Sequence, residues 1–320
     1  GETFERATFV HLTAAWTLPQ LAWLRAEMPE LSGRRDRLLT QKDWIRYRLT
    51  GMAVMDESDA AGTAMVDQRS MTWIDDVCTD VGLRPGQLPP IVPSTAPAGR
   101  LTREWAEATG LPEGIPFIAG ATDTATELVS VGAAAAGSSL VKIASTGTVV
   151  GVTDEPVVDR RCMTYPHALP GRWYTLASTN TATVAYQWLR EHVFAAEPAT
   201  PTETYVEMNR RAARVRAGAE GLLFLPFLTG ERTPYWDPDL RATFLGLAFG
   251  HGRDHLARAV LEGVALSIRG CRDAIEATGI DVAEPYLAGG GIIGSELWRS
   301  ILVSALGVRG QLADPQGPAV

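Results

Sequence analysis

Apolar residues follow two different spacings along this chain, and each spacing predicts its own type of element. In several segments they recur every three or four positions, which is typical of helices with one buried face. These expected helices cover residues 17–31, 40–50, 102–109, 124–131, 178–193, 202–214, 254–277 and 295–306. Short runs rich in Val, Ile, Leu and Phe predict strands at 117–119, 140–144, 149–152, 222–228 and 285–287. Helices that alternate with short strands indicate the α/β class.

Glycine and proline positions divide this pattern into parts. Gly51 and Gly110 directly follow two expected helices, at positions where glycine commonly ends a helix. Residues 56–67 are small and acidic and predict a loop or short strand, and the proline-rich residues 88–93 predict an extended connector. Helix content and glycine spacing both change near residue 132. We therefore predict two domains, residues 1–132 and residues 133–320.

Composition and charge exclude several classes of protein. The chain has 320 residues with a net charge of −8, which argues against a general nucleic-acid or membrane-surface partner, because those usually require a basic patch. Its 3 cysteines form no Cys-x-x-Cys pair, as expected in a reducing compartment. The sequence contains no long apolar run and begins with polar, acidic residues. We therefore expect a cytoplasmic protein.

The turn from residue 288 to residue 294 is rich in glycine and predicts a nucleotide site. It follows an expected strand and opens an expected helix, so bare backbone and helix N–H groups can approach a phosphate or an adenosine. Gly289, Gly291 and Gly294, with Asp314 further on, match the dinucleotide-binding pattern. Neither Lys42 nor Lys142 follows a glycine, so the chain has no Walker A loop.

Two further turns carry groups suited to phosphoryl transfer. Asp123 lies between an expected strand and helix, where a carboxylate can accept a proton from a substrate hydroxyl. The alternative is that Asp123 only caps the helix. The turn at residues 145–148 contains Thr146, Gly147 and Thr148, whose hydroxyl and backbone groups can bind phosphate oxygens. The alternative is an ordinary hairpin turn.

Two other groups of residues have a less specific pattern. His251 and His255 have the spacing of two metal ligands on one helix face, but the zinc-protease pattern fails between them. We interpret both as structural and Asp254 as the N-cap of the following helix. Residues 231–238 are dense in charged and aromatic side chains after an apolar strand, which fits either a stapled surface loop or a functional one.

Taken in order, several blocks resemble the FGGY family of carbohydrate kinases, most closely its xylulose kinases. The strongest block is Ala242-Thr243-Phe244-Leu245-Gly246-Leu247, followed by His255-Leu256-Ala257-Arg258-Ala259-Val260-Leu261-Glu262, which agrees with the family's second signature. Others lie at residues 17–24, 42–51, 58–63 and 225–234. The resemblance spans nearly all of residues 15–320. It replaces the NAD interpretation, because this family also ends a strand in a glycine turn.

The resemblance implies a pair of actin-like and hexokinase-like (ribonuclease H-like) α/β domains with an interdomain cleft. It implies ATP and Mg²⁺ as cofactors and a small sugar or polyol as partner, and it is compatible with a homodimer. The implied reaction converts D-xylulose to D-xylulose 5-phosphate; ribulose, erythritol, ribitol and a non-catalytic sugar-binding protein are the alternatives. The implied site residues are Asp123 as the general base that also binds substrate, Thr124 for substrate, and Thr146, Gly147, Thr148, Gly289, Gly290 and Gly291 for ATP.

The chain also departs from the family pattern. It has no counterpart of the family's first phosphate hairpin, which carries the metal-linked aspartate, and it stops before a further glycine turn. Both domains are therefore expected to be truncated and the 320-residue chain to be inactive, with metal ligands in the missing segment. Thr124 replaces an asparagine and Gln20 replaces a lysine, which leaves the sugar open.

Overall fold

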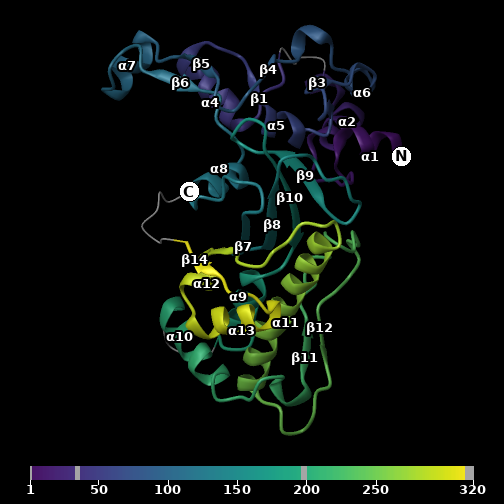
Figure 1. Ribbon diagram of the computed structural model, residues 1–320, viewed down its shortest axis with the longest axis vertical. Coiled ribbons are helices and arrows are strands. Elements are labelled where there is room, and N and C mark those ends of the chain that lie inside the picture. The colour runs from purple at the N-terminus through teal and green to yellow at the C-terminus, as the bar shows by residue number, and fades with distance from the viewer. Residues whose placement is uncertain (1, 33–36, 196–199, 314–320) are drawn as a thin grey trace.

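One mixed β-sheet forms the centre of the structure, a computed structural model that describes residues 2–32, 37–195 and 200–313 (Figure 1). Its strands are β7 (Ser139–Ile143), β8 (Gly147–Thr153), β9 (Met163–Pro166), β10 (Trp173–Thr179), β13 (Tyr286–Ala288) and β14 (Gln311–Leu312). They lie in the order β14-β13-β7-β8-β10-β9. The strands from β7 to β9 pair antiparallel, whereas β13 is parallel to both β7 and β14. This mixture of hairpins and parallel strands with helical connections confirms the predicted α/β class.

The pleat of the sheet divides the apolar residues of β7, β8 and β10 between two cores. Val141, Val149 and Ala177 belong to a core on one face, where they are joined by residues of four helices. These helices are α9 (Thr183–His192), α10 (Pro201–Ala212), α11 (Arg253–Glu276) and α13 (Glu296–Leu306). In Figure 1, α10 and α13 lie toward the bottom of the view, below β8 and β10. Leu140 and Val150 point to the opposite face and belong to the second core.

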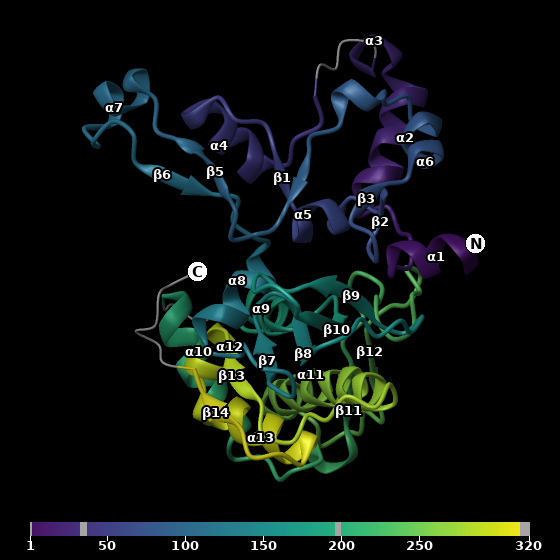
Figure 2. The same ribbon diagram turned by 45° about the horizontal axis from the view of Figure 1, so that its top comes forward.

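The N-terminal segments meet the sheet on that opposite face. Leu18, Leu21 and Ala61 pack in the same core as Leu140 and Val150. In Figures 1 and 2 the elements from α1 to α7 lie above the sheet, with α8 close to it. The helices of this part are α1 (Glu2–Thr8), α2 (Thr17–Glu27), α3 (Pro29–Ser32), α4 (Gln41–Thr50), α5 (Glu57–Gly62), α6 (Asp75–Asp80), α7 (Arg103–Thr109) and α8 (Asp123–Ser130).

The remaining elements are short pairs of strands and single turns of helix. β1 (Met55–Asp56) is parallel to β4 (Ile91–Val92), while the pairs β2 (Val66–Asp67) with β3 (Thr72–Trp73), β5 (Pro97–Arg100) with β6 (Pro116–Ile118) and β11 (Leu223–Leu225) with β12 (Thr243–Leu245) are antiparallel. Single turns occur at α12 (Gly290–Ile293), η1 (Pro85–Gln87) and η2 (Ala219–Gly221).

Local signals in the sequence located most helix ends. Gly51 and Gly110 are left-handed C-caps, with φ of 75° each, which confirms the predicted ends of α4 and α7. Ser295 caps α13 by accepting a hydrogen bond from the backbone N–H of Trp298. The helix expected over residues 17–31 ends at Glu27, because Pro29 begins a separate turn.

The structure corrects three predicted elements. Residues 57–62 form helix α5 and not a loop, because the Asp56 carboxylate caps it by accepting N–H groups of Ser58 and Asp59. The helix predicted over 178–193 begins at Thr183, since the residues before it complete strand β10. Asp254 is not an N-cap: α11 begins at Arg253, and Gly252 is its N-cap.

Among the described residues, no helix is long and apolar enough to cross a membrane. The predicted domain boundary at residue 132 stays a prediction, since the second core contains residues from both sides of it, such as Leu128 and Leu140.

Candidate functional site

A cavity of about 410 Å³ lies between the N-terminal segments and the face of the sheet that carries Leu140 and Val150. Trp16 and Ser58 line it from the N-terminal part. Asp123 and Thr124 line it from the start of α8. The cavity therefore lies between the two parts of the chain, where the family resemblance implies a cleft.

Cross-strand pairing gives this cavity a floor that is polar at one end and apolar at the other. The register sets Lys142 opposite Thr148 and Thr148 opposite Ser178, and it sets an apolar row beside them. The floor consists of the polar residues Lys142, Thr148 and Ser178 and the apolar residues Leu140, Val150, Leu176 and Met163. The polar row lies at the end of the sheet next to the turn after β7. Such a floor suits a ligand with a charged end and a carbon chain.

Asp123 is the first residue of α8, and its side chain is exposed at the cavity. The N-cap of α8 is Thr122 and Asp123 is the next residue. The alternative in which Asp123 caps the helix is therefore wrong. One carboxylate oxygen of Asp123 accepts the backbone N–H of Thr124 at 2.7 Å. The other oxygen has no hydrogen bond among the described residues. It is therefore free to accept a proton from a bound hydroxyl.

The turn at residues 144–146 joins β7 to β8, as the hairpin interpretation predicts, and Thr146 and Thr148 both line the cavity. The N–H groups of Ala182 and Thr183, at the start of α9, donate to the carbonyls of Ser145 and Ala144 at 2.9 Å each. Gly147 is buried in the hairpin and has no room for a side chain, since a Cβ would lie 2.7 Å from Ile268 Cγ1. The turn is thus held rigidly beside the polar row.

The glycine turn lies at a second cavity of about 380 Å³. Gly290 and Gly291 line this cavity, whereas Gly289 is the N-cap of α12 behind them. Its walls carry aromatic rings and one amide: Tyr186, Tyr205, Trp298 and Asn209. Flat apolar walls with a few polar groups suit a planar base. Of the predicted ATP residues, Thr146 and Thr148 therefore line the first cavity and Gly290 and Gly291 the second, whereas Gly147 and Gly289 line neither.

Ile143, the last residue of β7, is buried and packs against the glycine turn of the second cavity. A Cβ on Gly289 would lie 2.4 Å from the carbonyl oxygen of Ile143, and a Cβ on Gly291 would lie 2.5 Å from its side chain. The turn at residues 144–146 follows Ile143 directly. The glycine turn predicted to bind adenosine therefore packs against the end of β7, directly before the turn predicted to bind phosphate.

This close packing predicts a large difference between neighbouring glycines. Gly289→Ala is expected to lower the free energy of unfolding by about 1–3 kcal/mol, because Gly289 has φ of +93° and its new methyl group would overlap Ile143. Gly290→Ala is the control, since nothing lies within 4 Å of its Cβ. Urea unfolding of both variants measures the difference, and equal midpoints would contradict this packing.

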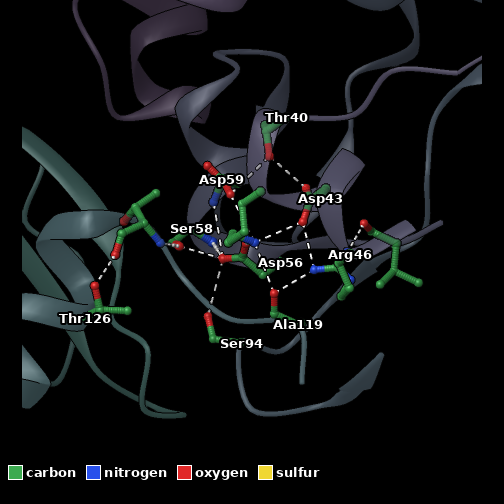
Figure 3. A network of polar contacts seen from close by, with 12 residues as sticks. Thr40, Asp43, Arg46, Asp56, Ser58, Asp59, Ser94, Ala119 and Thr126 are labelled. Atoms are coloured by element: carbon green, nitrogen blue, oxygen red, sulfur yellow. Dashed lines mark hydrogen bonds and ion pairs between the residues drawn. The ribbon is translucent and has the colours of Figure 1, made fainter. Parts of the chain in front are cut away.

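A cluster of charged side chains supports the N-terminal part of the site (Figure 3). Figure 3 shows Asp43, Asp56 and Asp59 turned toward one another. Lys42 Nζ lies 2.9, 2.7 and 3.1 Å from their respective carboxylate oxygens. Among the described residues, these three carboxylates lie close enough together to be considered as ligands of one metal ion. They do not fit a metal ion here, because the Lys42 ammonium already supplies the positive charge between them.

The same cluster is linked to the start of α8. Ser58 Oγ donates to Asp56 Oδ1 at 2.5 Å and accepts the backbone N–H of Thr122 at 2.9 Å. Thr122 Oγ1 lies 3.4 Å from the hydroxyl of Tyr174, on the sheet. Thr122, the residue before Asp123, is therefore held by Ser58 from the N-terminal part and by Tyr174 from the sheet.

Burial and neighbouring charges shift the pKa values in this cluster. Burial lowers the pKa of Lys42, but the charge of Asp56 and hydrogen bonds to Asp56 and Asp43 outweigh it, and the net pKa is raised. Burial and then the charge of Asp56 raise the pKa of Asp59 to about 6, against the attraction of Lys42. Asp59 is therefore the carboxyl group of the cluster that should titrate near neutral pH.

This raised pKa predicts a pH-dependent stability. The folded state holds the Asp59 proton more tightly than the unfolded state, so Asp59 should destabilise the protein increasingly as the pH rises from about 4 to 6. Asp59→Asn removes this effect, and its stability relative to the wild type should therefore increase over that pH range. Urea unfolding at several pH values tests this, with the exposed Asp76→Asn as control. The same pH dependence in both variants would contradict it.

Sequence reasoning missed several residues of the first cavity. Glu127 lies one turn after Asp123 and forms an ion pair with Lys142 Nζ at 2.8 Å. Arg232 also lines the cavity, within a segment that the sequence left ambiguous between staple and function. Their positions depend on contacts between distant segments, and no local pattern signals them.

The remaining candidates lie elsewhere. The rings of His251 and His255 are adjacent, with centroids 5.1 Å apart, but they line neither cavity, and the groups of potential metal ligands in the described part of the chain do not include them. Asp314, which belonged to the dinucleotide pattern, lies outside the described residues.

The strand order and the two turns at one end of the sheet define a two-part α/β fold of the actin-like and hexokinase-like class, as predicted. A family model for the N-terminal domain of the FGGY family of carbohydrate kinases matches residues 1–130. The model for the C-terminal domain of the same family matches residues 140–320. The chain therefore belongs to the FGGY family of carbohydrate kinases.

Individual relatives agree with this membership. The xylulose kinase of Escherichia coli (strain K12) is 33% identical over 298 residues, covering 91% of this chain and 59% of that protein. The gluconokinase of Bacillus subtilis (strain 168) is 30% identical over 290 residues, covering 89% and 56%. The crystal structure of xylulose kinase from Rhodospirillum rubrum has a TM-score of 0.88 at 29% identity, covering 99% and 63%. The chain thus spans about three fifths of the length of such relatives.

Proposed function

We propose that this chain is the part of a sugar kinase that binds the sugar and ATP, and that D-xylulose is its substrate. The observation that carries the proposal is that Asp123, the polar row and Thr146 of the turn at residues 144–146 line one cavity. A base and a phosphate turn that line one cavity are the parts that hydroxyl phosphorylation requires.

In the proposed mechanism the sugar lies between Asp123 and the floor of the sheet. A sugar hydroxyl attacks the terminal phosphorus of ATP, its proton passes to the free carboxylate oxygen of Asp123, and the bond between that phosphorus and ADP breaks. Thr146 and Thr148 bind phosphate oxygens through their hydroxyl groups, and Thr124 binds the sugar. The hydrogen bond from the Thr122 N–H to Ser58 Oγ fixes the position of the first turn of α8, which begins with Asp123. Catalysis then comes from position and charge.

In this proposal ATP spans the two cavities. The aromatic walls at Tyr186, Tyr205 and Trp298 suit the adenine ring, and Gly290 and Gly291 leave room for the ribose. The phosphates then extend past Ile143 to the turn at residues 144–146. Mg²⁺ would enter bound to ATP and neutralise phosphate charge. We assign it no ligand among the described residues, because the convergent carboxylates of Asp43, Asp56 and Asp59 already pair with Lys42.

Two classes of substrate are supported by relatives of similar identity. The 33% identical relative is a xylulose kinase, which favours a ketose. A 30% identical relative is a gluconokinase, which makes D-gluconate the second candidate. Ribulose, ribitol and erythritol remain in the proposed range of substrates. A sugar-binding protein without phosphoryl transfer is the alternative from another class.

The proposal is tested with protein expressed from the full reading frame. ADP release is followed with Mg-ATP and, separately, D-xylulose, D-ribulose, ribitol, erythritol and D-gluconate. We expect sugar-dependent release, fastest with D-xylulose. Faster turnover of D-gluconate would replace the ketose with the second candidate, and release that does not depend on any sugar would reject the kinase proposal.

A further inference from the structure

Arg232 is a cation at the first cavity that forms no ion pair with the described residues of the chain. Its guanidinium Nε donates to Asn180 Oδ1 at 3.1 Å, and Arg232 lines the cavity. Within residues 2–32, 37–195 and 200–313 the structure gives this guanidinium no carboxylate within 4 Å. Lys142, at the other end of the polar row, differs because it is paired with Glu127.

The backbone that carries Arg232 is anchored to the end of β10. The buried Glu231 carboxylate accepts the Thr179 hydroxyl at 2.5 Å, the Asn180 N–H at 2.8 Å and the Arg232 N–H at 2.7 Å. Thr233 Oγ1 donates to the Ser178 carbonyl at 3.0 Å and accepts the Ser178 N–H. Arg232 is therefore held at its backbone and at its side chain, which reduces the entropy lost when it binds a ligand.

Arg232 extends the polar row across the sheet. Lys142, Thr148 and Ser178 are cross-strand neighbours, and Thr148 Oγ1 lies 3.1 Å from Ser178 Oγ. Asn180, the residue directly after the end of β10, accepts a hydrogen bond from the guanidinium. The row thus contains two hydroxyl groups between two cations, beside the turn at residues 144–146. A preorganised cation without an acidic partner in such a row fits an oxyanion ligand.

We propose that Arg232 contacts the terminal phosphoryl group of ATP and stabilises the charge on its oxygens during transfer. This proposal rests on the proposed kinase function and adds a catalytic residue to it. Arginine suits the role because its planar guanidinium stays charged and can donate two parallel hydrogen bonds to phosphate oxygens. The carboxylate of a sugar acid is the other oxyanion that could lie here, and the test separates the two.

The test compares ATP and ADP, because only ATP carries the terminal phosphoryl group. In protein from the full reading frame, Arg232→Gln is expected to weaken ATP binding about tenfold, measured by calorimetry, and ADP binding less than about twofold. It should also lower kcat by about 10²–10³-fold with an unchanged KM for the sugar. Arg232→Lys, which keeps the charge, should recover part of both losses. A merely structural role would instead weaken ATP and ADP binding to the same extent.

The control is Arg241→Gln on the same loop. Arg241 is exposed and donates only to the carbonyls of Pro238 and Leu240 among the described residues, so its loss should leave kcat and both affinities unchanged. Equal effects of Arg232→Gln on ATP and ADP would overturn the proposal. A raised KM for D-gluconate alone would overturn it in favour of carboxylate recognition. A wild-type protein that binds neither nucleotide would overturn the kinase function as well, which distinguishes the two failures.

Discussion

Asp123→Asn is expected to lower kcat of the sugar-dependent reaction by about 10²–10⁴-fold while the KM for the sugar changes little. The amide has almost the same size as the carboxylate and keeps an oxygen for the Thr124 N–H, so the sugar should still bind. It cannot accept the hydroxyl proton, so the attacking oxygen is no longer activated. Steady-state kinetics of ADP release with D-xylulose measures both constants.

Asp75→Asn is the matched control for Asp123→Asn. Asp75 is also an exposed aspartate at the first position of a short helix, α6, but it lines neither cavity. Its replacement should remove only a favourable interaction with the helix dipole and leave kcat unchanged. If both variants kept the kcat of the wild type, Asp123 would be a structural residue at the start of α8 and the proposed mechanism would be wrong.

Lys42→Met is expected to lower the free energy of unfolding by about 3 kcal/mol, the lower end of the range for breaking a buried ion pair. The variant leaves Asp43 and Asp56, both buried, with fewer positive partners. Asp43 keeps Arg46 at 2.9 Å, whereas Asp56 keeps only neutral hydrogen-bond donors. The expected loss of stability is at the lower end of that range because the Lys42 side chain is 33% exposed, so water can solvate part of the charge that its removal leaves unpaired.

Lys142→Met is the matched control, since the sequence has only these two lysines and both form ion pairs. Lys142 is 30% exposed but contacts a single carboxylate, that of Glu127, so its loss should cost about 1 kcal/mol or less. Urea unfolding of the two variants gives the comparison. Equal losses of stability would show that the three aspartates do not depend on Lys42.

Local patterns in the sequence predicted much of the site. The hairpin around residues 145–148 and the position of Asp123 between a strand and a helix both follow from short segments whose residue types leave few alternatives. Helix α5 was missed because its small, polar residues give no apolar stripe. Its main signal was the capping carboxylate of Asp56, which also occurs in loops.

Contacts between distant segments could not be predicted in this way. The Lys42 cluster joins α4 to α5, and the link from Ser58 to Thr122 crosses from α5 to α8. Arg232 reaches the cavity on a loop that Glu231 and Thr233 anchor to β10. Each of these contacts depends on the tertiary fold, because the residues involved lie far apart in the sequence and share no local pattern.

The most direct test of the central claim is the fate of the terminal phosphoryl group of ATP. Protein from the full reading frame is incubated with Mg-ATP and D-xylulose, and the products are identified by mass spectrometry and phosphorus NMR. The proposed function predicts one phosphoryl group on the sugar, as D-xylulose 5-phosphate, for each ADP formed. ADP with free inorganic phosphate and unmodified sugars would contradict it, because Asp123 would then activate no sugar hydroxyl.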